Sequence, residues 1–188
     1  MAESGFDIAL DELVLAGARR GDLDACEKIY RKYQRPAFNT AIRICRCPEM
    51  ANDICQEAFI TVFRKIRQFR GDAPFWGWLR RVVVNHAISA IRRQPSAEHI
   101  EFEDYQASDS GQQEQMGVAM DLESALDQLS STDRAIVWLH DVEGYRHREI
   151  AGLFSKTESF SKTRLARARA RLREVMALAE KSQNICAS

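Results

Sequence analysis

The chain has 188 residues, of which 45% are hydrophobic and 29% are charged, and its formal net charge at pH 7 is zero. This hydrophobic content excludes an intrinsically disordered chain, because it supplies enough apolar surface for a packed core. No apolar run approaches the roughly 20 residues of a membrane-spanning helix, and the N-terminus lacks the pattern of a signal peptide, so we expect a cytoplasmic protein without membrane insertion.

The zero net charge is the sum of two segments of opposite charge. Residues 94–130 contain nine Asp and Glu but no Lys or Arg, whereas residues 162–173 contain six Lys and Arg but no acid. Opposite charges in different parts of a chain cancel in the total but not in the electrostatic field near either part. A basic surface that binds nucleic acid is therefore compatible with this composition.

Helical spacing of apolar side chains begins near the N-terminus. It predicts helices over residues 7–20 and 23–45, with Asp22 as the N-cap of the second. Pro36 predicts a kink or a helix restart within the second segment, and Pro48 can open a third helix.

Five cysteines are an odd number for a disulfide framework. Four of them lie in the N-terminal half and lack the paired C-x2-C spacing of a zinc site: Cys26, Cys45, Cys47 and Cys55. We expect Cys55 to be a small core residue and predict no metal and no cofactor.

Residues 53–93 predict two helices joined by a loop at residues 70–74. The first helix carries an apolar stripe that we expect to be buried: Cys55, Phe59, Val62, Ile66 and Phe69. A second, mostly polar face of that helix holds Asp53, Gln56, Glu57 and Ile60.

The second of these helices is expected to bury Leu79, Val82, Val83 and Ile91. It presents a polar stripe of Arg81, Asn85, Ser89 and Arg92. Arginine and asparagine donate hydrogen bonds to phosphates and base edges, so the stripe indicates nucleic-acid binding. On composition alone, an ordinary solvated helix face remains the alternative.

The C-terminal half contains a short predicted helix at 147–153, a turn at 154–156 and a long basic helix at 157–179. This order is typical of a helix-turn-helix motif. Residues 94–117 are acidic and rich in Ser and Gln, which predicts a flexible linker. The predicted fold is all-α, with two small helical domains at 1–93 and 118–180 and a tail at 181–188.

These fragments together resemble the extracytoplasmic-function (ECF) group of bacterial RNA polymerase sigma factors. Region 2 of that group is matched by Asp53, Gln56, Glu57 and Phe59, followed by Phe69–Asp72, Phe75, Trp78, Leu79 and Asn85. Region 4 is matched by Asp141–Tyr145, Glu149–Ala151 and the basic positions Lys162, Arg164, Arg167 and Arg169. The resemblance implies a factor that recruits core RNA polymerase to promoters and helps to open them, without catalysing a reaction.

For the N-terminal domain, the resemblance implies that Asp53, Gln56, Glu57 and Ile60 dock on the clamp helices of the polymerase β′ subunit. It implies that the loop of Arg70, Gly71 and Asp72, edged by Phe75 and Trp76, receives a flipped base of the downstream promoter element. Asn85 corresponds to a base-contacting asparagine. Phosphate contacts are assigned to Arg80, Arg81, Arg92 and Arg93. Ser89 is assigned to the same DNA-binding surface, and Trp78 is assigned to the core.

For the C-terminal domain, the resemblance implies contact with the β flap and entry of Lys162, Thr163, Arg164 and Arg167 into the major groove of the upstream promoter element. The group usually has Gly where Ser155 stands, and a left-handed conformation there costs a non-Gly residue roughly 1–2 kcal/mol. Ser155 and Thr157 compete as N-cap of the long helix, and Phe160 can meet a thymine methyl group.

The resemblance also implies partners beyond polymerase and promoter DNA, above all an anti-sigma factor that covers the core-binding faces. It places the acidic linker in the polymerase cleft, where its charge can imitate a nucleic-acid backbone. The alternative functions are a polymerase-independent helix-turn-helix regulator and a small cysteine-based metal or redox sensor. An enzyme is least favoured, because the four histidines have no Cys or Ser partner at a recognisable spacing.

Overall fold

The structure is a computed structural model that describes residues 10–93 and 122–186, and for residues 122–124 and 178–186 it describes the backbone alone. Within these ranges every regular element is a helix, which confirms the all-α class. The chain divides into two compact units, within Met1–Arg93 and within Gln94–Ser188. The predicted linker at 94–117 lies outside the described residues.

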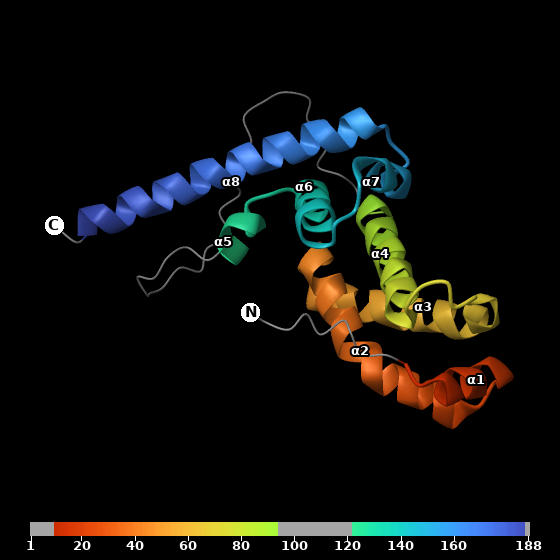
Figure 1. Cartoon of the computed structure of the whole chain (residues 1–188). Coiled ribbons are helices and arrows are strands. Elements are labelled where there is room, and N and C mark those ends of the chain that lie inside the picture. The colour runs from red at the N-terminus through yellow and green to blue at the C-terminus, as the bar shows by residue number, and fades with distance from the viewer. Residues whose placement is uncertain (1–9, 94–121, 187–188) are drawn as a thin grey trace. The chain divides into compact units, whose positions relative to one another are not determined.

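The described part of the first unit contains four α-helices and a short 3₁₀ turn: α1 (Glu12–Arg20), α2 (Leu23–Cys45), α3 (Pro48–Lys65), η1 (Ile66–Gln68) and α4 (Phe75–Arg93). Helices α2, α3 and α4 contact one another pairwise, and α1 lies against α2 (Figure 1). The part of the first predicted helix that precedes residue 10 lies outside the described residues.

Local sequence signals explain where these helices begin and end. The Asp22 carboxylate accepts a hydrogen bond from the backbone N–H of Asp24 at 2.9 Å, as expected of an N-cap. Pro48 is the first residue of α3. Helix α2 runs through Pro36 as one element, so a helix restart does not occur, and the Thr40 hydroxyl donates to the Pro36 carbonyl at 3.1 Å.

The core of the first unit contains the apolar stripe predicted for α3 and η1. All five of its members are buried: Cys55, Phe59, Val62, Ile66 and Phe69. In α4, Val82 is only partly buried, but Val84, Ala87 and Ile88 join the core. The inner face of α4 is therefore wider than the sequence pattern predicted.

The second unit contains α5 (Leu122–Asp127), α6 (Ser131–Val137), the π-helical turn η3 (Trp138–Val142), α7 (His147–Phe154) and α8 (Glu158–Cys186). Helix α8 contacts α5, α6 and α7 (Figure 1). The predicted helix-turn-helix is thus present as α7, a turn and α8, and the backbone of α8 continues helically past its expected end at Ala179.

The turn between α7 and α8 adopts the left-handed conformation, which costs free energy at a residue other than Gly. Ser155 is left-handed, with φ 54° and ψ 42°. Helix α8 begins at Glu158, and the backbone N–H of Phe160 donates to the Thr157 hydroxyl at 3.3 Å. Thr157 rather than Ser155 is therefore the N-cap.

None of the helices in the described ranges is both long enough and apolar enough to span a membrane.

Candidate partner and nucleic-acid interfaces

The mostly polar face of α3 is exposed along its length. Its four members, which we call the α3 face, are Asp53, Gln56, Glu57 and Ile60. Ile60 is 51% exposed although it is a large apolar residue. The buried stripe on the opposite side of α3 fixes this orientation, so the face is available to a partner.

One member of the α3 face is bonded to α4. The Nδ1 atom of His86 lies 3.2 Å from Oε2 of Glu57, and its Nε2 atom lies 3.0 Å from the Thr61 hydroxyl. A histidine protonated on Nδ1 alone satisfies both contacts, because it donates to the carboxylate and accepts from the hydroxyl. The guanidinium of Arg93 lies 4.0 Å from the same carboxylate oxygen. Sequence reasoning missed this link, because nothing in the spacing of His86 indicates its partner.

The loop before α4 has an exposed tip and an anchored base. Arg70, Gly71 and Asp72 are exposed, and Gly71 has a φ of 85°, which glycine adopts without strain. At the base, the Arg19 guanidinium donates to the Phe69 carbonyl, and Nε of Arg67 donates to the Arg19 carbonyl at 2.9 Å. These two reciprocal bonds hold the start of the loop against α1.

The burial of the aromatic residues at the start of α4 differs from the prediction. Phe75 and Trp76 are each only 5% exposed, and Trp76 stacks on Tyr33 with ring centroids 5.7 Å apart. Trp78, which was assigned to the core, is partly exposed while it packs against Phe69 at 5.3 Å. The expectation that Phe75 and Trp76 edge an open base pocket is therefore wrong for this conformation, because helical spacing turns both toward α2.

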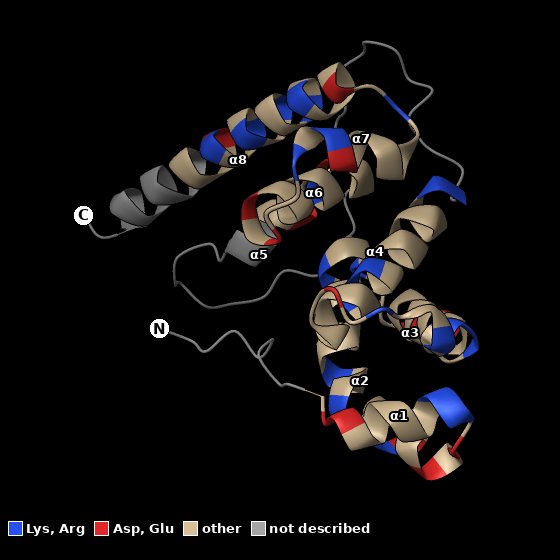
Figure 2. Ribbon diagram, turned by 45° about the vertical axis from the view of Figure 1, so that its right-hand side comes forward, with Lys and Arg blue, Asp and Glu red and all other residues tan. Residues whose placement is uncertain are grey.

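The polar stripe of α4 is exposed as predicted. Its four members are Arg81, Asn85, Ser89 and Arg92, while Arg80 is partly exposed. Basic ribbon segments occur at both ends of α4 (Figure 2). The stripe combines guanidinium, amide and hydroxyl donors, which is the set that binds phosphates and base edges.

The basic residues of α8 do not all face solvent, although they recur along the helix (Figure 2). Lys162, Thr163 and Arg167 are exposed. Arg164 is partly buried, and its Nη1 atom lies 3.3 Å from both carboxylate oxygens of Asp133. Arg164 was expected to enter the major groove, but its guanidinium is bound within its own unit.

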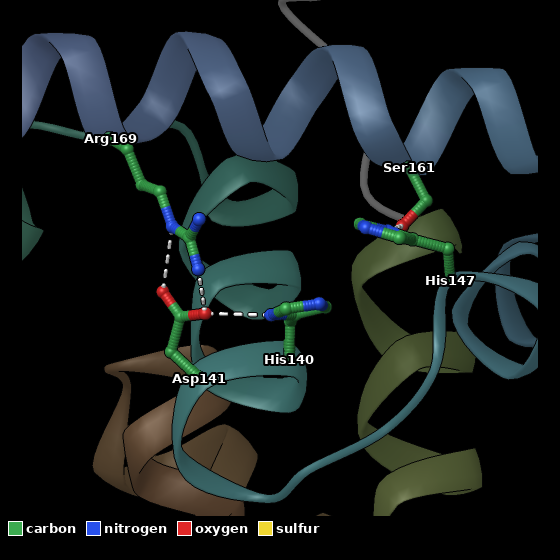
Figure 3. A network of polar contacts seen from close by, with 5 residues as sticks. All are labelled: His140, Asp141, His147, Ser161 and Arg169. Atoms are coloured by element: carbon green, nitrogen blue, oxygen red, sulfur yellow. Dashed lines mark hydrogen bonds and ion pairs between the residues drawn. The ribbon is translucent and has the colours of Figure 1, made fainter.

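A second arginine of α8 is also bonded to an acid. Nε and Nη2 of Arg169 donate to the two carboxylate oxygens of Asp141 at 3.2 and 2.5 Å (Figure 3). Burial alone raises the pKa of Asp141, but hydrogen bonds from Arg169 and His140 outweigh it and lower the pKa below its ordinary value. Arg169, one of the basic positions of the region 4 match, is therefore bonded to an acid of its own unit.

Two histidines lie beside this ion pair. The rings of His140 and His147 stack with centroids 4.6 Å apart, and Nδ1 of His147 lies 3.0 Å from the hydroxyl of the fully buried Ser161 (Figure 3). Desolvation, followed by electrostatic interactions with His140 and Lys162, lowers the pKa of His147. The neutral form of His147 is therefore favoured, and it connects α7 to α8.

The cysteines of the first unit show no arrangement for metal binding. Cys45 donates to the Cys47 carbonyl at 3.4 Å, and burial together with Cys45 raises the pKa of the Cys55 thiol to about 11. Within the part of the chain that the structure describes, no three His, Cys, Asp or Glu side chains are grouped so that they could hold a metal ion.

Family comparisons match both units. The family model described as Sigma-70 region 2 matches residues 29–96, and the one described as Sigma-70, region 4 matches residues 119–172. The two matches cover the surfaces described above, in the order that the sequence motifs predicted.

Individual relatives extend the similarity over almost the whole chain. The ECF RNA polymerase sigma factor SigM of Mycobacterium tuberculosis is 32% identical over 93% of this chain and 89% of its own length. The RNA polymerase sigma-H factor of Pseudomonas aeruginosa is 29% identical over 85% of this chain and 90% of its own.

A solved structure agrees in fold. The sigma factor RpoE in complex with the anti-sigma factor NepR from Bartonella quintana matches 80% of this chain and 96% of its own, with 21% identity and a TM-score of 0.52. A helix-turn-helix regulator that acts without polymerase is not favoured by these matches. The chain therefore belongs to the ECF sigma factors, which direct core RNA polymerase to specific promoters.

Proposed function

We propose that the α3 face docks on core polymerase while the α4 stripe and the loop before it bind the downstream promoter element. The observation that carries this proposal is the exposure, on neighbouring parts of one unit, of a carboxylate–amide face and a separate arginine–asparagine stripe. An acidic and amide face beside an apolar residue suits a basic groove with an apolar floor. The proposed groove is that of the clamp helices of the β′ subunit, which the resemblance to ECF sigma factors implies.

The downstream element requires a receptor for an unstacked base. Unstacking costs a few kcal/mol, so a protein surface must replace the lost contacts. The exposed loop of Arg70, Gly71 and Asp72 offers backbone and side-chain partners, and its anchored base limits the entropy lost on binding. Trp78 supplies the partly exposed ring, in place of Phe75 and Trp76. Asn85 contacts a base edge, and Arg80, Arg81, Ser89 and Arg92 hold the backbone.

In the second unit, Lys162, Thr163 and Arg167 read the upstream element in the major groove. Their exposure on α8 supports this assignment, because side chains at the N-terminal part of a recognition helix reach base edges. The same unit contacts the β flap. The protein acts in the cytoplasm as a non-catalytic factor, since both polymerase and promoter DNA are there.

An anti-sigma factor is the proposed regulator. The similar RpoE structure is a complex with an anti-sigma factor. A partner that covers the α3 face would block docking on polymerase directly. Ile60, the exposed apolar residue in that face, supplies the area for such a contact.

Binding to core polymerase tests the docking assignment. Asp53→Lys reverses one charge of the α3 face and should weaken binding to purified core enzyme by at least about tenfold, equivalent to about 1.4 kcal/mol. Glu27→Lys on α2 makes the same charge change at an exposed position outside the face and is the matched control. Equal affinities for the two variants would refute the assignment.

Transcription in vitro tests the promoter assignment separately. Asn85→Ala should leave binding to core enzyme intact and reduce initiation from promoters selected by the wild-type holoenzyme. If Asn85→Ala weakened core binding and Asp53→Lys did not, the two surfaces would have to exchange roles.

A further inference from the structure

Helix α8 has a narrow buried stripe made of aliphatic and small side chains. Its members are Ser161, Leu165, Ala168, Leu172 and Val175. Hydrophobic contacts are non-directional, so a stripe of this kind attracts α8 to the unit without strictly determining its rotation about its own axis. That rotation decides which side chains face DNA.

The pair Arg169–Asp141 supplies a directional contact on one flank of the stripe. It is a two-bond ion pair, and such pairs combine charge with a defined geometry. Asp141 lies in the π-helical turn η3, where the backbone N–H of Glu143 donates to the Trp138 carbonyl at 3.1 Å. His140 also bonds to the Asp141 carboxylate at 2.7 Å, which further restricts its orientation (Figure 3).

The pair Arg164–Asp133 supplies a directional contact on the other flank. Asp133 lies in the first turn of α6, where its backbone N–H donates to the Ser130 hydroxyl at 3.1 Å. The Ser130 hydroxyl donates in turn to the Asp133 carboxylate at 2.9 Å. The guanidinium of Arg164 also lies 5.5 Å from the centre of the Phe160 ring. Phe160 packs against Phe154, so it supports Arg164 instead of standing free for a thymine.

Helical geometry places the two pairs on opposite sides. At about 100° per residue, Arg164 lies roughly 60° to one side of the buried stripe and Arg169 roughly 80° to the other. Thr163 and Arg167 then fall on the far side of α8, away from the stripe, in agreement with their exposure. A rotation of α8 in either direction would stretch one of the two pairs.

We propose that Arg164 and Arg169 are positioning residues, which bind Asp133 and Asp141 and set the rotation of α8 so that Lys162, Thr163 and Arg167 meet the upstream element together. This inference rests on the proposed reading role of those three residues. Arg164 is then no longer one of the residues that read bases. Asp133 and Asp141, whose negative charge does not suit DNA binding, acquire a function in promoter recognition.

A double-mutant cycle in the holoenzyme tests the proposal. Asp141→Ala, Arg169→Ala, the double variant and the swap Asp141→Arg with Arg169→Asp are each assembled with core polymerase. Each holoenzyme is then used to select DNA from a library randomised in the upstream element, at fixed salt. Asp141→Ala and Arg169→Ala should each weaken binding about three- to tenfold and relax several positions at once. The double variant should bind DNA no more weakly than the weaker-binding single variant, and the swap variant should recover most of the lost affinity.

A direct DNA contact by Arg169 gives the opposite pattern. Asp141→Ala would then leave binding unchanged or improve it, Arg169→Ala would alter one position, and the swap would be the worst variant because it places a carboxylate near phosphate. That pattern overturns the proposal. Asp133→Asn and Arg164→Ala repeat the test on the other flank with the same expectations.

Thermal unfolding of each variant separates positioning from simple loss of fold. A binding loss fully explained by the unfolded fraction at the assay temperature would overturn the proposal, whereas relaxed selectivity in a folded variant supports it. Arg173→Ala removes the same charge from an exposed position further along α8 and should weaken binding without changing base preference. Arg167→Ala should relax a single position. If it relaxes none, the reading face itself is wrong, whatever the cycle shows.

Discussion

Helices α4 and α8 both carry a row of arginines assigned to DNA, but they are held in place differently. Helix α4 buries a wide face that includes Phe75, Trp76 and Leu79, and its polar stripe is exposed. Helix α8 buries a narrower stripe, and two of its arginines bind acids of the same unit. The turn before α4 uses Gly71 in a left-handed conformation, whereas the turn before α8 uses Ser155.

The difference shows that a basic helix can be oriented by packing or by polar bonds. Large buried aromatic side chains interlock and leave few alternative orientations, so packing supplies most of the orientation of α4, beside the contacts of His86 and Arg93 with Glu57. Where the buried stripe is narrow and made of aliphatic and small side chains, hydrogen-bonded ion pairs supply the direction that packing lacks. Part of the positive charge of α8 is therefore used within the unit and not at the DNA.

The aromatic core of the first unit gives the largest expected effect. Trp76→Ala should lower the free energy of unfolding by about 3–5 kcal/mol, because it empties a buried site beside Tyr33. Trp78→Ala, at a partly exposed position, should cost clearly less and should instead impair promoter opening. Urea unfolding followed by circular dichroism measures the first effect, and transcription from a premelted template tests the second. A larger stability loss for Trp78→Ala would contradict the burial on which the comparison depends.

A substitution in the polar stripe of α4 should have the next largest effect. Asn85→Ala should reduce discrimination at one position of the downstream element by about 1–3 kcal/mol, with little change in stability because the side chain is exposed. Competition between promoter variants for the holoenzyme measures it. Arg92→Ala is the control, and it should weaken binding to all variants nearly equally. Equal selectivity profiles for the two variants would show that α4 makes only backbone contacts.

The sequence was sufficient to predict the elements that depend on local signals. The spacing of Cys55, Phe59 and Val62 predicted the buried stripe of α3 because period and burial are linked directly. The N-cap at Asp22 was predicted from the residue type alone, whereas the left-handed strain at Ser155 was implied by the glycine that the resembled family usually has at this position. The exposure of the α3 face followed from the same periodicity.

Contacts between distant residues could not be predicted in the same way. Arg164 and Asp133, and likewise Glu57 and His86, are paired through the tertiary fold, and neither spacing nor composition indicates the partner. The aromatic misassignment has a similar cause. Phe75, Trp76 and Trp78 form one cluster in sequence, and which ring faces inward depends on the position of α2. The predicted acidic linker lies outside the described residues, so its proposed role stays a prediction.

Replacement of Ser155, the turn residue before α8, should have a smaller effect, and it should raise stability where the substitutions above lower stability or selectivity. Ser155→Gly should stabilise the second unit by about 0.5–1 kcal/mol, because relief of left-handed strain exceeds the added entropy of the unfolded chain. Thermal unfolding measures the gain. Gly144→Ala is the matched control, since Gly144 has a φ of 72° and open space around the missing Cβ. That variant should lose stability through backbone strain alone, and a loss at Ser155→Gly would mean that the serine side chain stabilises the turn.

The smallest expected effect is a pH dependence of the contact between α7 and α8. The pKa of His147 is lowered from its ordinary 6.5 by desolvation and by His140, Lys162 and Arg169, against an opposing contribution from Glu158. The unfolded chain therefore binds a proton more readily than the folded chain, so the free energy of unfolding should fall as the pH drops below about 6.5. The pKa of Asp141 is also lowered, but its contribution to stability is lost only as the pH falls below 3.8, so the two effects occupy separate pH ranges.

Proton NMR titration of the His147 ring measures its pKa. Unfolding of His147→Gln between about pH 7.5 and 5.5 should show a weaker pH dependence than the wild type. An unchanged dependence would mean that the pKa of His147 is the same in the folded and the unfolded chain, which would contradict this prediction.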